Sequence, residues 1–313
     1  MKVVTTSTPR SAPRIALASA AEARGLDEDL PPLLAALAES GIDADVVDWD
    51  AADVDWSSFD IVVLRSTWDY AARAVQFLAW IDAVSAQTRL LNPASIVHWN
   101  TDKHYLADLA QALIAIVPSR YIEPRDPIEA ALRDFLDEFP DAHDFVVKPC
   151  IGAGSRDARR HARKELTAAS AQIGRLLAQG RSVLIQPYLD RVDSAGETAL
   201  VYIDGVYSHA IRKGPILARG ADSTSELFAP EQIDSRQPGN DELALGERVL
   251  AAIPHASPLL YTRVDLIRDG GGAPLVLELE LVEPSLFFNH GERSAQRMAT
   301  AILERVSQVK GKG

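Results

Sequence analysis

Short apolar runs alternate with segments of helical periodicity through the first third of the chain. The pattern predicts strands at residues 14–20, 44–47 and 60–64 and helices at residues 30–40 and 75–86. The third strand reads D-I-V-V-L, an apolar run that is typical of a strand buried on both faces. This alternation of strands and helices predicts an open, mostly parallel α/β sheet over about the first 95 residues.

The rest of the chain has a different pattern, with strands that follow one another directly. Helices are predicted at residues 102–114, 127–139, 165–179, 241–252 and 292–306, and strands at residues 144–148, 182–188, 260–267 and 275–281. The dipeptide Asp204-Gly205 lies between two apolar runs, which is typical of a hairpin turn. No internal repeat and no low-complexity linker separates these elements, so the sequence marks no sharp boundary between units.

The clearest two-residue alternation lies near the end of the chain, in V-L-E-L-E-L-V-E-P-S. Because successive side chains of a strand point to opposite faces, Glu278 and Glu280 are expected on one face. Leu277, Leu279 and Leu281 are expected on the other face. Neighbouring like charges repel each other, so the acidic face either lies in solvent or binds a cation.

Composition and charge narrow the class of protein. At 313 residues, with 47% hydrophobic and 24% charged residues, the chain is typical of a soluble globular protein with two or three packed units. The net charge of −12 disfavours a nucleic-acid partner, because a phosphate backbone would be repelled. No apolar run approaches the roughly 18 to 20 residues of a membrane span, so no membrane partner is expected. Cys150 is the only cysteine, which excludes an internal disulfide and favours a reducing, cytoplasmic location.

A lysine and a glycine-rich stretch follow the strand predicted at residues 144–148, in F-V-V-K-P-C-I-G-A-G-S-R. Lys148 ends the strand, and the loop after it can direct backbone N–H groups and a cation toward phosphates. The stretch is not a Walker motif, because the lysine precedes the glycines. The alternative is a solvent-facing lysine before a flexible turn.

A second lysine, Lys103, lies in N-T-D-K-H-Y-L at the start of the helix predicted at residues 102–114. Asn100 or Thr101 would cap that helix and place Lys103 in its first turn. A cation is unfavourable beside the positive end of a helix unless an anion binds nearby. Lys103 is therefore a candidate anion ligand, and an exposed surface lysine is the alternative.

Three carboxylates are expected on one patch of the C-terminal hairpin. Asp265 lies on the first strand, and a Gly-Gly-Gly turn joins it to the strand with Glu278 and Glu280. Same-face side chains of a hairpin come close together, and three uncompensated acids would repel each other. Hard divalent cations such as Mg²⁺ prefer oxygen ligands of this kind, so a metal site is predicted, with a solvated outer face as the alternative. Glu283 falls outside the alternation and is assigned to the substrate side or to the turn.

These motifs follow one another along the chain, with a further strand, V-L-I-Q-P-Y-L-D, between them. As an ordered set they resemble the ATP-grasp superfamily, and the layout is most similar to the branch of glutathione synthetase and ribosomal-protein S6 glutamate ligase. The resemblance covers about residues 90–306. It implies an α/β ATP-grasp fold, divided into an N-terminal open parallel α/β domain on the substrate side (1–100), a lid (101–185) and a C-terminal domain that binds ATP and magnesium (186–313).

The resemblance implies ATP and two Mg²⁺ ions as cofactors, and it assigns roles to individual residues. The implied ATP-binding residues are Lys103, Lys148, Gly152, Gly154, Ser155, Gln186, Tyr188, Leu189 and Glu197, and the implied metal ligands are Asp265, Glu278 and Glu280. The two lysines would contact the α- and β-phosphates, and the glycine loop would close over them. Gln186, Tyr188 and Leu189 would flank the adenine, and Glu197 would hold the ribose. Glu280 stands where the family usually has asparagine, but it still offers oxygen ligands.

One departure from the family concerns the cation that stabilises the reacting groups. Where the family often reads G-D-x-R, this chain reads G-E-T-A, with Ala199 in place of the arginine. Arg212, Lys213 and Arg263 are therefore the candidate catalytic cations. The implied reaction transfers the γ-phosphoryl group of ATP to a substrate carboxylate, and an amine then attacks the acyl phosphate. Such chemistry needs positioning and charge neutralisation more than a protein nucleophile.

The substrate is expected after the third strand, where the chain reads R-S-T-W-D-Y, because ligands of open α/β sheets gather beyond the carboxyl ends of strands. Arg65 would pair with a carboxylate and Asp69 with an ammonium group, which suits a small amino acid. The predicted substrate-binding residues are Arg65, Ser66, Trp68, Asp69, Tyr70 and Ser285. The alternative is a helix cap with packed aromatic rings.

The stretches R-S-T-W-D-Y and S-L-F-F-N-H resemble the cycloserine synthetase group of ATP-grasp enzymes. This resemblance implies antibiotic biosynthesis, with O-ureidoserine as the substrate of an intramolecular cyclisation. Two alternatives stay open: a ligase that joins an amino acid to a second amino acid or peptide, and a nucleotide-binding regulatory protein without activity. The oligomeric state, monomer or homo-oligomer, also stays open.

Overall fold

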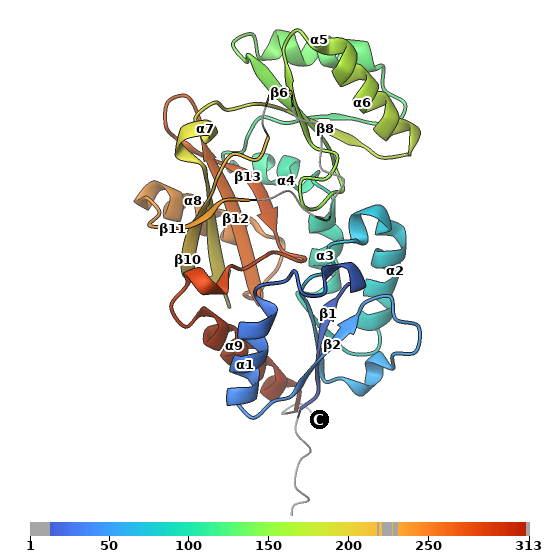
Figure 1. Ribbon diagram of the computed structural model, residues 1–313, viewed down its shortest axis with the longest axis vertical. Coiled ribbons are helices and arrows are strands. Elements are labelled where there is room, and N and C mark those ends of the chain that lie inside the picture. The colour runs from blue at the N-terminus through green and yellow to red at the C-terminus, as the bar shows by residue number, and fades with distance from the viewer. Residues whose placement is uncertain (1–12, 218, 221–226, 228–230, 311–313) are drawn as a thin grey trace, which may run out of the picture.

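The computed structural model describes residues 13–217, 219–220, 227 and 231–310, and Figure 1 shows three units along the chain. An α/β unit begins the chain, a lid lies at the opposite end of the molecule, and an antiparallel unit stands between them. None of the helices in the described ranges is both long and apolar enough to cross a membrane.

The N-terminal unit is the predicted parallel sheet. It consists of β1 (Ile15–Ser19), β2 (Ala44–Asp48), β3 (Ile61–Leu64) and β4 (Arg89–Leu91), in the order β2-β1-β3-β4. All three strand pairs are parallel, which confirms the prediction from the alternating pattern. The sequence did not indicate β4, because a strand of three residues is too short to show a period.

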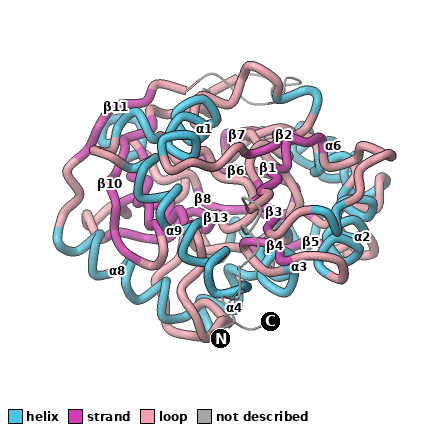
Figure 2. Tube along the Cα trace, turned by 90° about the horizontal axis from the view of Figure 1, so that it is seen from below, coloured by secondary structure: helices cyan, strands magenta, loops and turns pink. Residues whose placement is uncertain are grey.

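Helices cover both faces of this sheet. Ile15 and Leu17 of β1 pack in one core with α1 (Leu30–Glu39) and α9 (Ser294–Lys310), whereas Ala16 and Ala18 pack in another with α2 (Ala74–Ser85) and α3 (Ala94–Thr101). Figures 1 and 2 both show α1 beside α9. The C-terminal helix therefore completes the core of the first unit.

The lid is a four-stranded antiparallel sheet covered by two helices. Its strands are β5 (Arg120–Ile122), β6 (Asp144–Pro149), β7 (Arg159–Ala162) and β8 (Val183–Pro187), in the order β5-β8-β6-β7, and its helices are α5 (Ile128–Glu138) and α6 (Leu166–Ala178). Phe135, Phe145 and Ile173 lie in a core that belongs to this unit alone. The sequence missed β7, because R-R-H-A has none of the apolar residues that usually mark a strand.

The antiparallel unit is a five-stranded sheet in the order β11-β10-β9-β12-β13. Its strands are β9 (Glu197–Ile203), β10 (Val206–Lys213), β11 (Ile233–Arg236), β12 (Tyr261–Arg268) and β13 (Pro274–Glu280). Helices α4 (Tyr105–Gln111), α7 (Val192–Ala195) and α8 (Asn240–Ala252) lie around it. Short 3-10 helices occur elsewhere in the described chain, at Ala21–Ala23, Trp56–Ser58, Tyr70–Ala72 and Phe288–His290. Both predicted hairpins form, β9–β10 across Asp204-Gly205 and β12–β13 across the glycine turn.

The helix predicted at residues 102–114 forms over the shorter range Tyr105–Gln111, and its predicted start was wrong. Helix α3 ends at Thr101 and α4 begins at Tyr105, so Lys103 lies in the connection and not in a first turn. Asp102 has an extended backbone, and its side chain accepts the N–H of His104 at 3.1 Å. Aspartate side chains often form such local hydrogen bonds to the backbone, and these compete with helix formation. The N–H of Lys103 instead donates to the carbonyl of Cys150, which ties the connection to the lid.

A β-bulge interrupts the alternation in β13. Asp265 pairs with Glu278, but the next residue, Leu266, pairs with Val276, which leaves Leu277 without a partner opposite it. Leu279 therefore packs in the same core as Val276, whereas Leu277 packs with Tyr188 and Leu189 on the other side. The prediction that Leu277 shares a face with Leu279 and Leu281 was wrong, because a bulge shifts the two-residue period by one position.

Candidate active site

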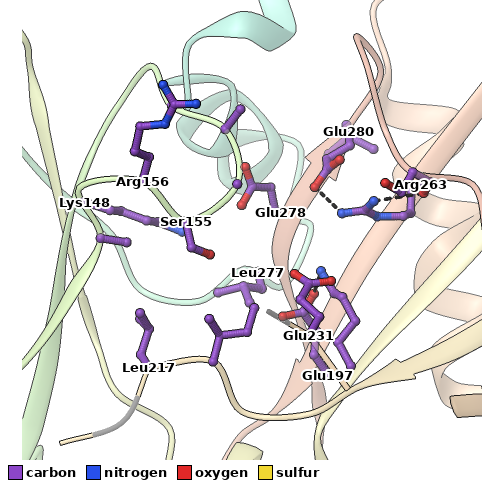
Figure 3. A pocket seen from close by; sticks show the side chains of 18 of the residues that line it. Lys148, Ser155, Arg156, Glu197, Leu217, Glu231, Arg263, Leu277, Glu278 and Glu280 are labelled. Carbon is purple, nitrogen blue, oxygen red and sulfur yellow. Dashed lines mark hydrogen bonds and ion pairs between the residues drawn. The ribbon is translucent and has the colours of Figure 1, made fainter. Parts of the chain in front are cut away.

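A cavity of about 420 Å³ lies where the three units meet. Figure 3 shows Lys148, Ser155 and Arg156 on one side of this cavity and Arg263 and Glu280 on the other, with Glu278 between them. The structure brings all nine predicted ATP-binding residues to its wall: Lys103, Lys148, Gly152, Gly154, Ser155, Gln186, Tyr188, Leu189 and Glu197. Residues separated by more than 90 positions in the sequence thus share one site.

The two predicted phosphate lysines have different surroundings. The Lys103 ammonium group lies 2.9 Å from a Glu278 carboxylate oxygen and donates to the carbonyl of Gly152 at 3.0 Å. Burial would lower the pKa of Lys103, but the charge of Glu278 outweighs it and raises the pKa. Burial lowers the pKa of Lys148, and none of the described carboxylates forms an ion pair with it. Lys148 is therefore a half-buried cation available to an anionic ligand.

A network of charges connects β9, β10, β12 and β13 at the far wall. Lys213 contacts Glu197 and donates to Asp265 at 2.7 Å. Arg263 donates to both oxygens of Asp265, each at 2.9 Å, and also contacts Glu280. Although burial opposes ionisation, Arg263 and Lys213 hold the pKa of Asp265 well below its usual range. Burial, which Lys213 only partly offsets, raises the pKa of Glu197 to about 8.

The three predicted metal ligands do not converge in this structure. Glu278 and Glu280 line the cavity, but Asp265 is buried behind them and both of its oxygens are bound by Arg263 and Lys213. Among the described residues, three ligand atoms of acid, histidine or cysteine side chains come within 4.8 Å of one another in a different cluster, near Cys150. The predicted metal ligands do not belong to it.

The cavity wall nevertheless fits a hard cation. Burial and the charges of Asp265 and Glu278 raise the pKa of Glu280 to about 7, although Arg263 opposes this. A carboxylate that is crowded by other carboxylates gains most from an additional positive charge. Oxygen donors of this kind favour Mg²⁺ over softer metals.

The glycine loop and the bulge supply features that sequence reasoning missed. Arg156 lines the cavity, and its Nε atom is buried without a hydrogen-bond partner in the described part of the chain. Gly154 and Ser155 have φ values of 62° and 59°, so the loop turns sharply here, in a conformation that glycine adopts readily. The G-A-G-S-R motif contained this arginine, which was the signal that could have identified it. The bulge adds Leu277 as an apolar wall beside the acids.

Arg65 does not contact the cavity, which corrects its predicted role in binding the substrate carboxylate. Its side chain is 0% exposed, and its guanidinium lies 3.3 Å from Asp29 and 3.6 Å from Asp27. It also donates to the carbonyl of Pro284 at 3.3 Å. Asp29 accepts the backbone N–H groups of residues 286, 287 and 288. Arg65 therefore helps to hold the segment after β13 in place.

Three other predicted residues also lie outside the cavity. Ser66 is fully buried and shares a 2.8 Å hydrogen bond with Ser19. Asp69 accepts a 2.8 Å bond from the indole of Trp49 and pairs with Arg73, so it is not free to take an ammonium group. The third, Arg212, points toward α7, where it donates to the carbonyl of Ala195 at 3.0 Å.

The remaining substrate predictions do reach the cavity, together with residues that were not predicted. Trp68, Tyr70, Ser285, Lys213 and Arg263 line it as expected. Glu283, which the sequence assigned to the substrate side or to the turn, also lines it. The residues of the wall that were not predicted include Glu28, Glu231, Phe287, Asn289 and His290. The last three lie in S-L-F-F-N-H, a stretch used for the family resemblance but not resolved into single site residues.

Comparisons with known proteins agree with this geometry. The solved structure of the ATP-grasp ligase PsnB with its minimal precursor has a TM-score of 0.63 at 20% identity, covering 94% of this chain and 99% of that chain. The lid, the antiparallel sheet and the cavity between them define the fold of an ATP-grasp ligase.

A narrower family can also be stated. Residues 15–92 match the family model described as D-cycloserine synthetase DcsG, N-terminal domain. The cycloserine biosynthesis protein DcsG of Streptomyces lavendulae is 44% identical over 296 residues, which cover 93% of this chain and 98% of that relative. The crystal structure of D-cycloserine synthetase DcsG has a TM-score of 0.88 at 43% identity, covering 94% of this chain and 99% of that chain. This chain belongs to the DcsG family and is an ATP-dependent ligase.

Proposed function

We propose that the protein converts O-ureidoserine to a cyclic product, after ATP has activated the substrate carboxylate as an acyl phosphate. The observation that carries this proposal is the 44% identity to the cycloserine biosynthesis protein DcsG over nearly the full length of both chains. The cavity supports it, because phosphate-binding cations face an acidic and aromatic region on the side of the N-terminal unit. A small amino acid would fit between the two.

The cavity also suits ATP. Within the described ranges, the amine of Lys148 has no ion-pair partner and the buried Nε atom of Arg156 has no hydrogen-bond partner, so both are donors that phosphate oxygens would satisfy. Lys103 would add a third cation from the connection between α3 and α4. Leu277, Tyr188 and Leu189 form the apolar wall against which the adenine would lie.

Magnesium would be held by Glu278 and Glu280, with Asp265 behind them. When bound, Mg²⁺ neutralises the charge that the phosphates carry during transfer, and we propose two ions. Lys103 and Arg263 now occupy the carboxylates of Glu278 and Glu280. A phosphate that attracted these two cations would leave both carboxylates available to the metal.

The chain's own residues would position the reactants and exclude water. Lys213 and Arg263 are anchored on neighbouring parts of one sheet through Asp265, so both cations keep a fixed direction toward the cavity. Fixed charges stabilise developing negative charge without reorganisation, which is the main requirement of phosphoryl and acyl transfer. The glycine loop at residues 152–156 would cover the phosphates and protect the acyl phosphate from hydrolysis.

The experiment that tests this function measures ADP release and product formation with D- and L-O-ureidoserine in the presence of Mg²⁺-ATP. Release without any second substrate, together with a ring product, is the expected result. If release requires a second amino acid or an added amine, the protein is an intermolecular ligase. If neither isomer supports release under any condition, the proposed substrate is wrong.

A further inference from the structure

One part of the cavity wall has no role in binding ATP or metal. It consists of Trp68 and Tyr70 from the N-terminal unit and Glu283 from the segment after β13. The Trp68 indole donates to the backbone carbonyl of Glu283 at 2.9 Å. The Tyr70 side chain lines the same part of the wall and lowers the pKa of the Glu283 carboxyl group. Two aromatic side chains thus lie beside Glu283 at the surface of the cavity.

Glu283 differs from Glu197, Glu278 and Glu280 in its charge balance. Glu197, Glu278 and Glu280 each contact a lysine or arginine. Among the described residues, no lysine or arginine forms an ion pair with Glu283. Burial and the charge of Glu280 raise the pKa of Glu283 to about 8, although Tyr70 and Lys103 oppose this shift. A ligand that brings a cation to Glu283 would compensate this site.

We propose that Glu283, together with Tyr70 and Trp68, binds the α-ammonium group of the amino-acid substrate. This inference rests on the proposed function and gives the ammonium role, predicted for Asp69, to a residue that reaches the cavity. An ammonium group pairs well with a desolvated carboxylate, and aromatic rings beside it add a cation–π attraction.

The position of Glu283 relative to Arg263 suits a zwitterion. Arg263 donates to the carbonyl of Ser285 at 2.9 Å, two residues after Glu283, and lies over the ring of Phe287 at 5.5 Å from its centroid. The short segment that carries the acidic group of Glu283 therefore also contacts the basic group of Arg263. A small amino acid would direct its carboxylate toward Arg263 and Lys213 and its ammonium group toward Glu283.

The subsite is fixed before any ligand arrives. Arg65 donates to the carbonyl of Pro284, and Trp68 donates to that of Glu283, so two side chains of the N-terminal unit hold adjacent peptide groups. Asp29 fixes the following residues through their N–H groups. A pre-organised carboxylate binds its partner with less loss of conformational entropy than a mobile one.

Glu28 is the competing candidate, because it also lines the cavity from the N-terminal unit. Its side chain is exposed, and an exposed ion pair is screened by water and contributes little binding energy. Glu283 is more buried, and its backbone is fixed by Trp68, so the larger effect on ammonium binding is assigned to Glu283.

The test compares two ligands that differ only in the amino group: O-ureidoserine and 3-(ureidooxy)propanoate. Calorimetric titration with Mg²⁺ and a non-hydrolysable ATP analogue gives the affinity of each ligand for the full chain and for Glu283→Gln, Glu28→Gln and Glu292→Gln. Glu292→Gln removes the same charge from an exposed residue that does not line the cavity. ADP release by the wild type with O-ureidoserine is measured in parallel.

We expect the wild type to prefer O-ureidoserine, and Glu283→Gln to lose this preference by roughly 30-fold or more, as for a buried charge pair that loses one partner. Binding of the ATP analogue by Glu283→Gln should stay within about twofold of wild type. Glu28→Gln and Glu292→Gln should keep the preference. The proposal is overturned if Glu283→Gln keeps it, if Glu28→Gln loses more, or if Glu283→Gln instead shifts the Mg²⁺ requirement.

The two readouts separate this proposal from the proposed function. ADP release by the wild type with O-ureidoserine, combined with a Glu283→Gln variant that keeps the preference, overturns only the ammonium subsite. If the wild type releases no ADP but prefers the ligand with the amino group through Glu283, the reaction is wrong and the subsite stands. If the wild type binds neither ligand, both proposals fail.

Discussion

Arg65 shows how far a single residue can be interpreted from its position in the sequence. R-S-T-W-D-Y correctly indicated the end of β3 that faces the cavity, and Trp68 and Tyr70 do reach it. Alternation could not tell which side chains turn inward, because Asp27 and Asp29, the partners that bury Arg65, lie in an irregular segment without periodicity. The same holds for Asp69, whose partner Trp49 is 20 residues away.

Replacing Arg65 by alanine should destabilise the fold and not merely the substrate site. The change leaves Asp27 and Asp29 buried without their cation, which typically costs about 3–5 kcal/mol. Urea denaturation monitored by circular dichroism measures the free energy of unfolding. Arg14→Ala, which removes an exposed ion pair with Asp45, is the control and should change it by less than about 1 kcal/mol. Equal effects of the two variants would contradict a structural role for Arg65.

Lys148→Met should weaken ATP binding without destabilising the protein. Burial lowers the pKa of this lysine, and none of the described acids pairs with it, so an apolar side chain of similar length removes an unfavourable charge. We expect an unchanged or higher melting temperature and at least a tenfold loss of ATP affinity, measured by calorimetry. Lys164→Met, at an exposed lysine of the same unit, should leave the affinity unchanged. Loss of stability without loss of affinity would show that Lys148 is structural.

Glu283 predicts a pH dependence of stability in the absence of ligand. The pKa of this group is raised from 4.5 to about 8 in the folded protein, so the folded state retains a proton that the unfolded state has lost. Stability must then fall as pH rises from about 4.5 to about 8, because the unfolded state binds fewer protons in that range. Glu283→Gln removes this one titrating group and leaves the titratable groups around it in place, which are Glu278, Glu280, Lys103 and Tyr70. This variant should have a higher melting temperature than the wild type at pH 8 and a similar one at pH 5. The same difference in melting temperature between the two proteins at both pH values would contradict the assignment.

At the scale of elements, long and regular patterns were predicted well. The predicted β12–β13 hairpin forms, and helices α5 (Ile128–Glu138) and α6 (Leu166–Ala178) lie within a residue of their predicted ends. Departures occur where one local interaction outweighs the pattern: the turn at Asp102 moves the start of the helix to Tyr105, and the bulge moves Leu277 to the acidic face. Neither leaves a signal in the spacing of apolar residues.

Gly196 makes the start of β9 a sensitive point. Its φ is 72°, and a Cβ atom there would lie 2.6 Å from the carbonyl oxygen of Lys213. Gly196→Ala should therefore displace the Glu197–Lys213 pair and cost more than the roughly 1–2 kcal/mol of a positive φ alone. Gly25→Ala, at a φ of 75°, meets no atom within 4 Å, so it is the control for a positive φ without a steric clash. Melting temperature and ATP affinity should both fall further in Gly196→Ala than in Gly25→Ala. Equal losses of stability in the two variants would exclude the clash.

At the scale of the whole molecule, the site exists only where the three units meet. Loop residues Ile151 and Ala153 from the lid pack against the same cluster as Tyr70 and Val282. A ligand in the cavity therefore contacts parts of the chain that belong to separate cores, and it should stabilise their arrangement.

Mg²⁺-ATP should accordingly raise the melting temperature. At a ligand concentration 100 times the dissociation constant, mass action adds about 2.7 kcal/mol to the free energy of unfolding. Chelation of the metal with EDTA should reduce the shift, since the acids would again crowd each other and repel the phosphates. Differential scanning calorimetry measures both effects. In Glu278→Gln, the part of the melting-temperature shift that depends on the metal should be smaller than in the wild type. An equal shift of the wild type with and without EDTA would contradict a magnesium site.

The packing of α9 on the first sheet has a consequence for how the chain is made. Met298, Ile302 and Val306 share a core with Ile15 and Leu33, although nearly 300 residues separate the two ends of this contact. A ribosome completes the N-terminal sheet and α1 long before it reaches α9, so the apolar face of that sheet stays partly uncovered while the lid and the second sheet are synthesised. The first unit of this protein is thus the earliest to be translated and among the last to complete its core.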